Sequence, residues 1–409
     1  MEKEKICILI TMEYPFLKGE TFLESEVVYL ANNFDYVLVF ALNGFGSQTR
    51  GVPKNVECIA VKNTKGLLRY VKYAFNGIIG SGIVQRRELF KSPNILGFLS
   101  SLYARGRVNA SYKKILALLN DSLSSHNPKS ILFYSYWFMD QALLAVLISD
   151  QFKNACDTKV ISRAHGYDLY EYRNKTNYIP FRNLVFKKID MVYPCSKDGA
   201  SYLKAKYPQY TNKIEVAYLG SADNGIQKLS NKIKGFHIVS CSSLIPLKRN
   251  YLIAEALAIL KEKGIHDIHW TCIGSGPEES RIIKIINNND LKQQVLLTGN
   301  LTNSQVMSNY RENYYDLFVN VSTAEGLPVS IMEAQSFGIP SIATNVGGTK
   351  EIVSEKTGKL LPSNLDSALL ADTILEFYNM TIEQKTVLRD AARNNWEKKF
   401  NSERNYSKW

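Results

Sequence analysis

The feature that most constrains the fold is an alternation of short apolar runs with helical patterns along nearly the whole chain. Short apolar runs predict buried strands, and runs with a period near 3.6 residues predict helices. In the first half the predicted strands are Ile6–Thr11, Tyr36–Leu42, Val56–Val61, Ser130–Ser135, Lys159–Ala164, Met191–Cys195 and Ile214–Tyr218. The predicted helices are Glu20–Asn32, Tyr112–Leu123, Gln141–Phe152 and Lys197–Lys206, with mixed helix and loop over residues 66–110.

The alternation stops at a polar stretch without periodicity, residues 221–235, which predicts an interdomain linker. It then restarts. The strands predicted after this stretch are His237–Cys241, Ile268–Ile273, Val295–Thr298, Asp316–Asn320 and Ser341–Thr344. The helices are Tyr251–Lys263, Glu278–Asn288, Ser304–Glu312, Val329–Phe337 and Leu365–Tyr378.

Strand–helix alternation in both halves predicts an α/β protein with two doubly wound, Rossmann-like domains. A length of 409 residues suits two domains. We expect an N-terminal domain at 1–220 and a C-terminal domain at 236–409, with the last helix a candidate to pack back on the first domain. Because doubly wound sheets bind ligands beyond the carboxyl ends of their strands, the site is expected in a cleft between the domains.

Most of the net charge of +12 lies in one segment, residues 62–114, where eleven bases face the single acid Glu88. The bases are Lys62, Lys65, Arg69, Lys72, Arg86, Arg87, Lys91, Arg105, Arg107, Lys113 and Lys114. Apolar and aromatic residues are interleaved with them, a pattern typical of segments that lie on anionic lipid headgroups. The alternatives are an ordinary solvated helical face and nucleic acid, but we find no nucleic-acid-binding pattern and expect no nucleic-acid partner.

The cysteines and histidines give no sign of a disulfide framework or a metal site. The six cysteines are scattered without a C-x-x-C pair, which predicts reduced thiols in a cytosolic protein. His126, His237, His266 and His269 show no ligand spacing, so no metal is expected. We see neither a signal peptide nor an apolar run of about 18 residues. The expected location is the cytoplasm, with peripheral attachment to the inner face of the plasma membrane if segment 62–114 binds lipid.

The strongest functional pattern is the stretch from Asn320 to Glu333, which joins a strand end to a helix start. Gly326 and Pro328 break the chain, and proline suits the first turn of a helix. The backbone N–H groups of that turn and the helix dipole favour a diphosphate. The carboxylates at its two ends, Glu325 and Glu333, suit sugar hydroxyls. On spacing alone, a capped helix with one surface acid explains the pattern equally well.

Two adjacent bases, Lys248 and Arg249, precede the predicted helix Tyr251–Lys263. Cations oppose the dipole at the start of a helix. Their placement is therefore better explained if they face a bound anion, and a solvated pair of bases is the alternative.

These motifs, in this order, resemble the retaining glycosyltransferases of family four, which have the two-domain GT-B fold. The E-x7-E pattern is written here E-G-L-P-V-S-I-M-E, and the resemblance is closest to bacterial enzymes that build capsule, exopolysaccharide or O-antigen chains. Further matching segments are the glycine loop Tyr14–Phe22, the His-Gly segment Arg163–Asp168, the turn Ile273–Pro277, and the Gly-Gly segment Thr344–Gly348 with Glu351. One departure is Ser243, which stands where the family often has a diphosphate-binding arginine; Arg249 is expected to supply part of that charge.

The resemblance implies a role for each matched residue. Glu325 would contact the donor sugar, Lys248 the pyrophosphate, and His165 the donor sugar at the reacting carbon; these three are the candidate catalytic residues. The candidate donor-binding residues are Gly19, Arg249, Gly274, Gly299, Leu327, Pro328, Val329, Ser330 and Glu333. Glu333 would accept hydrogen bonds from the ribose, and no residue is implied as a metal ligand.

The resemblance implies a metal-independent hexosyltransferase that moves a sugar, with retention, from a UDP- or GDP-sugar to a glycan or lipid-linked glycan in bacterial surface polysaccharide synthesis. It implies no cofactor beyond the donor substrate. One rival is a non-catalytic accessory subunit of a polysaccharide assembly complex, against which the intact Glu325, Glu333, Lys248 and His165 speak. Another is a sugar-nucleotide epimerase of the same fold, which would leave the basic segment unexplained.

Overall fold

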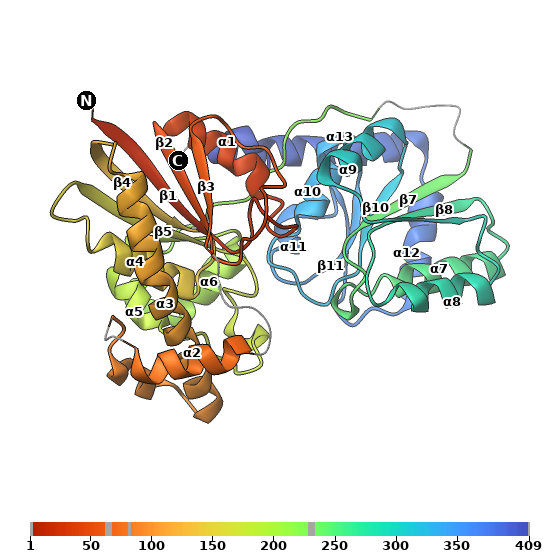
Figure 1. The fold of residues 1–409 in the computed structure, drawn as a ribbon. Helices are drawn as coiled ribbons and strands as arrows, with labels where there is room; N and C mark the ends of the chain where they lie inside the picture. The colour runs from red at the N-terminus through yellow and green to blue at the C-terminus, as the bar shows by residue number, and fades with distance from the viewer. Residues whose placement is uncertain (1–2, 62–67, 81–82, 228–233, 408–409) are drawn as a thin grey trace. The chain divides into compact units, whose positions relative to one another are not determined.

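The computed structural model describes residues 3–61, 68–80, 83–227 and 234–407, and the side chains of Leu68 and Arg69 are outside that description. The chain divides into two compact units (Figure 1). Unit 1 comprises Met1–Ala217 with Tyr406–Trp409, and unit 2 comprises Tyr218–Asn405.

Unit 1 is built on a six-stranded parallel sheet in the order β3-β2-β1-β4-β5-β6. The strands are β1 (Glu4–Thr11), β2 (Tyr36–Ala41), β3 (Val56–Ala60), β4 (Pro128–Ser135), β5 (Asp157–Ala164) and β6 (Met191–Pro194). On β1, Ile6 and Ile8 face one apolar core and Cys7 and Leu9 face another. The strands read as continuous apolar runs because both faces of the sheet are covered.

The helices of unit 1 form a layer on each face of this sheet (Figure 1). α1 shares the core of Cys7 and Leu9, whereas α3 and α4 contribute to the core of Ile6 and Ile8. Every residue of α4 is buried. The helical elements are α1 (Leu23–Asn33), α2 (Leu68–Ile79), η1 (Arg86–Lys91), α3 (Ile95–Ser122), α4 (Asp140–Ser149), η2 (Glu171–Arg173), α5 (Arg182–Lys188), α6 (Lys197–Lys206) and η3 (Pro208–Lys213).

Unit 2 repeats this plan with a parallel sheet in the order β12-β11-β10-β7-β8-β9. Its strands are β7 (Phe236–Cys241), β8 (Ile268–Ile273), β9 (Val295–Gly299), β10 (Leu317–Asn320), β11 (Ser341–Thr344) and β12 (Gly358–Leu361). Its helices are η4 (Pro246–Lys248), α7 (Tyr251–Glu262), α8 (Glu279–Asn288), α9 (Asn303–Glu312), α10 (Val329–Ser336), α11 (Thr349–Ile352), α12 (Ser367–Tyr378), α13 (Ile382–Lys399) and α14 (Ser402–Tyr406). The predicted fold class, two doubly wound Rossmann-like sheets, is confirmed.

One predicted strand, Ile214–Tyr218, is wrong. Only Ile214 forms an isolated bridge, to Val192. The segment does lie beside β6, since the amide of Ala217 donates to the carbonyl of Pro194 at 3.0 Å. Pro194 has no N–H group to return a ladder bond, so the pairing does not develop into a strand.

Residues 221–227 of the stretch predicted as a linker belong to unit 2 and pack within it. Nε1 of Trp396 donates to Oγ of Ser221 at 2.8 Å, and Nε2 of Gln227 donates to the carbonyl of Tyr310 at 2.7 Å. Residues 228–233 lie outside the described residues. Tyr406, at the end of α14, belongs to unit 1, and its ring packs on Tyr29 of that unit at a centroid distance of 5.7 Å.

None of the six cysteines forms a disulfide, and Cys7, Cys195 and Cys272 are buried. Among the helices that the structure describes, none combines the length and the apolar character needed to cross a membrane.

Candidate active site

Each sheet has a topological switch point, where the strand order turns back on itself. It lies between β1 and β4 in unit 1 and between β7 and β10 in unit 2. Ligands of doubly wound sheets bind beyond the carboxyl ends of the strands at such points. Gly19 follows β1, Lys248 follows β7 and Glu325 follows β10, so these predicted residues flank the two switch points.

Lys248 and Glu325 meet at the switch point of unit 2. Nζ of Lys248 lies 2.6 Å from Oε1 of Glu325, and their side chains are only 21% and 11% exposed. Nδ2 of Asn320, at the end of β10, donates to the same carboxylate oxygen at 3.3 Å. The two loops are also joined by their backbones, because the amide of Thr323 donates to the carbonyl of Leu247 at 2.8 Å. The structure therefore pairs two residues that the sequence could place only on separate loops.

The loop after β11 supports Glu325 from the other side. The amide of Gly348 donates to the carbonyl of Gly326 at 2.9 Å. Gly347 has a φ of +51°, and a Cβ there would lie 2.0 Å from the carbonyl oxygen of Glu325. Any residue with a side chain at 347 would therefore push the Glu325 loop out of place.

The Glu325 loop leads directly into α10, which begins at Val329. Pro328 is the residue just before the helix, and Leu327 is buried. The amides of Val329 and Ser330 lie in the first turn, where a helix offers no acceptor of its own. With the positive end of the helix dipole, they form a seat for an anion on the same edge of the sheet as Lys248.

Glu333 lies one turn further into α10 and is half-buried. Nδ2 of Asn303, at the start of α9, donates to its Oε1 at 2.7 Å. Burial raises the pKa of Glu333 to about 7, although the bond from Asn303 opposes the shift. The carboxyl thus changes its charge near neutral pH.

Arg249 lies under the loop that follows β10. Its Nε donates to the carbonyl of Val321 at 2.8 Å, and burial lowers its pKa. Its Nη2 is buried and has no hydrogen-bond partner in the part of the chain that the structure describes. Arg249 therefore keeps one donor for a further acceptor, but its contact is with Val321 rather than with the Lys248–Glu325 pair.

Gly274 and Gly299 face each other across an isolated bridge, in which the amide of Gly274 donates to the carbonyl of Gly299 at 2.9 Å. A Cβ on Gly274 would lie 1.9 Å from the carbonyl oxygen of Ser242, so close chain packing alone explains this glycine. A Cβ on Gly299 would meet nothing within 4 Å. Open space therefore borders Gly299, as a ligand-lining position requires.

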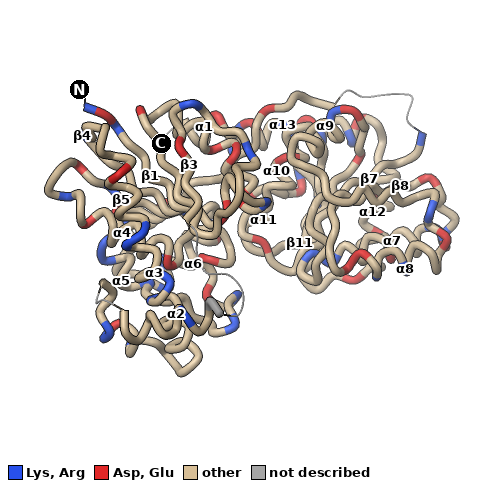
Figure 2. Tube along the Cα trace, viewed as in Figure 1, with Lys and Arg blue, Asp and Glu red and all other residues tan. Residues whose placement is uncertain are grey.

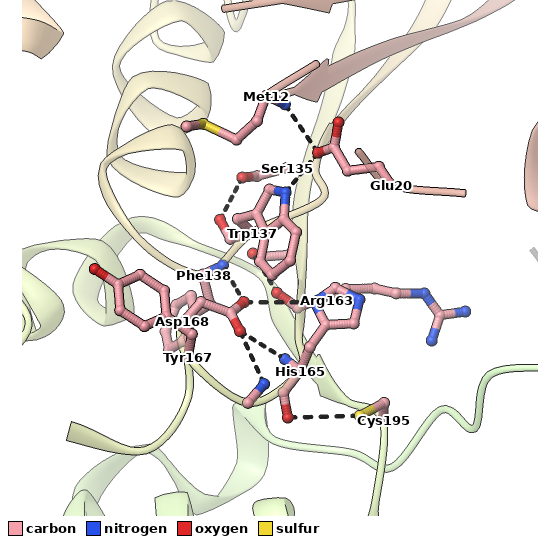
Figure 3. A network of polar contacts seen from close by, with 12 residues as sticks. Met12, Glu20, Ser135, Trp137, Phe138, Arg163, His165, Tyr167, Asp168 and Cys195 are labelled. Carbon is pink, nitrogen blue, oxygen red and sulfur yellow. Dashed lines mark hydrogen bonds and ion pairs between the residues drawn. The ribbon is translucent and has the colours of Figure 1, made fainter. Parts of the chain in front are cut away.

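In unit 1, His165 is buried at the end of β5 and packs among aromatic rings. Its ring centroid lies 4.7 Å from that of Tyr136 and 4.8 Å from that of Trp137. Its Nδ1 lies 3.5 Å from Oδ2 of Asp168, which is fully buried (Figure 3). Of the aromatic run 133–138, Phe133, Tyr134, Tyr136 and Phe138 are core residues, and Trp137 is the one beside His165 that is only partly buried.

The Asp168 carboxylate fixes the loop that carries His165. It accepts backbone N–H bonds from His165 at 2.9 Å, Gly166 at 3.1 Å and Phe138 at 2.9 Å. Burial alone would raise the pKa of Asp168, but the bonds from His165 and the backbone hold it below the ordinary value. Asp168 was quoted in the sequence motif without a role, and the structure shows it as the anchor of the motif.

Gly19 lies in a loop organised by Glu20. The Glu20 carboxylate accepts the amides of Met12 at 2.9 Å and of Glu13 and Tyr14 at 2.8 Å, and it also accepts the indole N–H of Trp137 (Figure 3). These bonds join the loops after β1 and β4 across the switch point of unit 1. Sequence reasoning missed Glu20, and its only signal was an acid placed directly after Gly19.

Across the four described ranges, no group of His, Cys, Asp and Glu side chains is arranged to hold a metal ion. The charged groups that the structure gathers in unit 2 are instead a lysine, two carboxylates and an arginine, at the edge of the sheet where α10 begins. Such a set suits a diphosphate joined to hydroxyl-rich groups.

The C-terminal part of the chain is similar to a known protein family. Residues 223–395 match the family model described as glycosyl transferases group 1. The chain is similar to "Putative colanic acid biosynthesis glycosyltransferase WcaL" of Escherichia coli strain K12, at 27% identity over 252 residues, which cover 60% of this chain and 61% of that protein. It is also similar to the "UDP-N-acetylglucosamine–peptide N-acetylglucosaminyltransferase GtfA subunit" of Streptococcus pneumoniae serotype 4, at 30% identity over 182 residues, which cover 44% of this chain and 34% of that protein.

Among solved structures, Anabaena Alr3699/HepE in complex with UDP and glucose superposes with a TM-score of 0.67 at 16% identity, over 99% of this chain and 97% of that chain. The fold is therefore that of the GT-B glycosyltransferases. Unit 2 contains a glycosyl transferases group 1 domain, and the chain has relatives in bacterial polysaccharide pathways. The matched region spans about three-fifths of the length of the E. coli relative.

Proposed function

We propose that this protein is a retaining, metal-independent glycosyltransferase that moves a sugar from a UDP-sugar to a glycan or lipid-linked glycan in bacterial surface polysaccharide synthesis. The observation that carries the proposal is the Lys248–Glu325 pair at the switch point of unit 2, beside the start of α10. The UDP named for Alr3699/HepE and the UDP-sugar named for the GtfA subunit favour uracil over guanine as the donor base.

Each site residue is assigned to one part of the donor. Lys248 and the amides of Val329 and Ser330 hold the diphosphate, and Glu325 accepts hydroxyls of the sugar. Glu333 accepts the ribose hydroxyls, and Gly299 borders the base. Leu327 and Pro328 shape the turn into α10, and Gly274 packs the neighbouring loop.

Transfer forms a bond between the acceptor oxygen and the anomeric carbon and breaks the bond between that carbon and the diphosphate oxygen. The main task is to stabilise negative charge on the leaving oxygen. Lys248 and the first-turn amides do this, and the departing phosphate takes the proton of the acceptor hydroxyl. The family resemblance assigns two residues of unit 1 to the donor as well, His165 to its sugar and Gly19 to its pyrophosphate. Attack then comes from the face that the leaving group vacates, and configuration is retained.

The location of the acceptor determines where in the cell the protein acts. A lipid-linked acceptor lies at the inner face of the plasma membrane, so an anionic membrane surface is the second partner we propose, with segment 62–114 of unit 1 facing it.

The test is a thermal-shift titration with UDP and GDP, in the presence of EDTA, for the wild type and Lys248→Ala. At 100 times its dissociation constant a ligand adds about 2.7 kcal/mol of stability, which shifts melting measurably. We expect UDP to stabilise the wild type and not the variant. Incubation with UDP-sugars and NMR of the product would then reveal its anomer. An inverted product would overturn the retaining mechanism, and no response to any nucleotide would favour the accessory subunit instead.

A further inference from the structure

An unusual apolar face covers one end of unit 1, formed by α2, η1 and the start of α3. Nine large apolar side chains on these elements are between 50% and 78% exposed. They are Tyr70, Val71, Phe75, Ile78, Ile79, Phe90, Ile95, Leu96 and Leu99. We call this set the α2–α3 face. Singly exposed apolar residues are ordinary, but a grouped set marks an interaction surface.

Helix α2 has a packed inner side and an exposed outer side. The inner side lies very close to α3, as shown by Gly106, where a Cβ would lie 1.7 Å from the carbonyl oxygen of Tyr73. Val71, Phe75 and Ile78 recur at helical spacing on the outer side, and all are exposed. A surface helix normally turns polar residues outward. α2 is apolar on both sides, and no element among the described residues covers its outer side.

A buried arginine holds α2 in this position. Arg105 on α3 is fully buried, and it donates to the carbonyls of Val84 at 2.7 Å, Gly80 at 3.3 Å and Gly77. It thereby caps the carbonyl end of α2, where helices leave acceptors unsatisfied. The charge of Arg105 is therefore used inside the fold. The same holds for Arg107, which pairs with Asp140. Neither arginine belongs to the basic surface expected from the sequence.

Among the described residues of these elements, exposed bases accompany the apolar residues. Lys72, Arg86, Arg87 and Lys91 are exposed, and Glu88 lies 2.6 Å from Lys91 and 4.0 Å from Arg87. Figure 2 shows segments of Lys and Arg, in blue, around α2. Apolar insertion combined with a positive surplus is the combination that anionic lipid headgroups bind.

We propose that the α2–α3 face inserts into the headgroup region of an anionic bilayer, with its apolar side chains reaching the acyl boundary and its bases on the lipid phosphates. Interfacial helices of this kind lie about 5–10 Å deep. The inference deepens the membrane partner proposed above, and it adds that attachment is apolar as well as electrostatic. UDP binding tests the proposed donor site and vesicle binding tests the α2–α3 face, so the two proposals fail in different assays.

The test is sedimentation of the full chain with vesicles of phosphatidylcholine alone or mixed with phosphatidylglycerol. The test variant is Phe75→Ser/Ile79→Ser/Phe90→Ser. The matched control, Leu296→Ser/Ile382→Ser/Val387→Ser, removes side chains of similar exposure from unit 2. We expect mixed vesicles to bind the wild type and the control, and the test variant to partition about tenfold more weakly for each side chain lost. Both variants should keep the UDP-induced thermal shift, which shows that they are folded.

A second measurement separates insertion from adsorption. The variant Phe75→Trp places a fluorophore in the face, and brominated lipid in the mixed vesicles should quench it. Vesicle binding by the test variant equal to that of the wild type would overturn insertion, and so would indole fluorescence of Phe75→Trp that brominated lipid leaves unchanged. A concentration-dependent dimer that only the test variant loses would also overturn it, because the face would then cover a second copy of the chain.

Discussion

Nζ of Lys248 lies 2.6 Å from Oε1 of Glu325, so the cation proposed to hold the diphosphate is already paired with the carboxylate proposed to hold the sugar. The pair fixes a long, flexible side chain at the point where the leaving group must sit, which lowers the entropy lost on binding. It also means that the diphosphate must compete with, or share, the charge of Lys248. The two residues therefore affect affinity in opposite directions.

Lys248→Ala should lower turnover by about 10²-fold, the typical cost of losing one group that stabilises the leaving charge. It should also weaken UDP binding. Glu325→Gln should lower turnover as well, but it should bind UDP severalfold more tightly because Lys248 loses its counter-charge. Calorimetric titration with UDP measures both. Lys284→Ala on α8, an exposed lysine away from the site, is the control. If the two site variants weaken UDP binding alike, the pair is not in competition with the diphosphate.

Gly347→Ala should disable the site without unfolding unit 2. The new Cβ would collide with the carbonyl of Glu325, and a φ of +51° already disfavours a side chain. We expect a loss of turnover of about 10²-fold, since small displacements of positioned groups have effects of this size. Gly264→Ala is the matched control, because Gly264 also has a positive φ, +83°, but open space around its Cβ. Equal activity losses in the two variants would assign the effect to backbone strain alone.

The sheets were readable from sequence because their strands are covered on both faces and appear as unbroken apolar runs. Ile268–Ile273 was predicted with the bounds that β8 has in the structure. The apolar pattern does not predict β12, because this strand has only four residues, Gly358–Leu361, and includes Lys359. The bounds of α13 were not predicted, since only Arg389, Ala392 and Trp396 of its 18 residues are buried and no apolar period stands out. Its one clear signal was a capping box at Thr381 and Gln384.

At the site, sequence predicted the residues but not their pairings. Gly326 and Pro328 indicated a loop and a helix start between Glu325 and Glu333, and α10 confirms that helix start. Nothing in the sequence brings Lys248 to Glu325, because that contact depends on the order of strands β7 and β10 in the sheet. Glu20 was missed for the same reason, since its partner Trp137 lies on the loop after β4.

Glu20→Ala should loosen the loop that carries Gly19. The carboxylate accepts three backbone amides and the indole of Trp137, and its removal leaves these buried or partly buried donors unsatisfied. Each such loss costs about 1–3 kcal/mol, so destabilisation of at least about 3 kcal/mol is expected. Hydrogen exchange should speed up at Met12, Glu13 and Tyr14. Asp121→Ala, at an exposed position of α3, is the control. Unchanged exchange at these three amides would show that the loop holds its shape without Glu20.

Glu333 should make the stability of the protein depend on pH near neutrality. Burial raises its pKa to about 7, whereas the unfolded chain titrates near 4.5. Between these values the folded protein keeps a proton that the unfolded chain has released, so folding stability falls as pH rises through this window. The stabilising contribution is complete below pH 4.5 and is lost above pH 7. At about 1.4 kcal/mol for each pKa unit, partial exposure leaves a change of about 1–3 kcal/mol.

Glu333→Gln removes this titration while keeping the side-chain shape. Urea unfolding at pH 5 and pH 8 should show a smaller loss of stability in the variant than in the wild type, and Glu312→Gln, an exposed acid on α9, should behave as the wild type. UDP affinity should rise above pH 7 in the wild type, because the ionised carboxylate is the better acceptor for ribose hydroxyls. Glu333→Gln should lose that rise. Parallel stability profiles for Glu333→Gln and the wild type would mean that the carboxyl ionises in the folded protein as freely as in the unfolded chain.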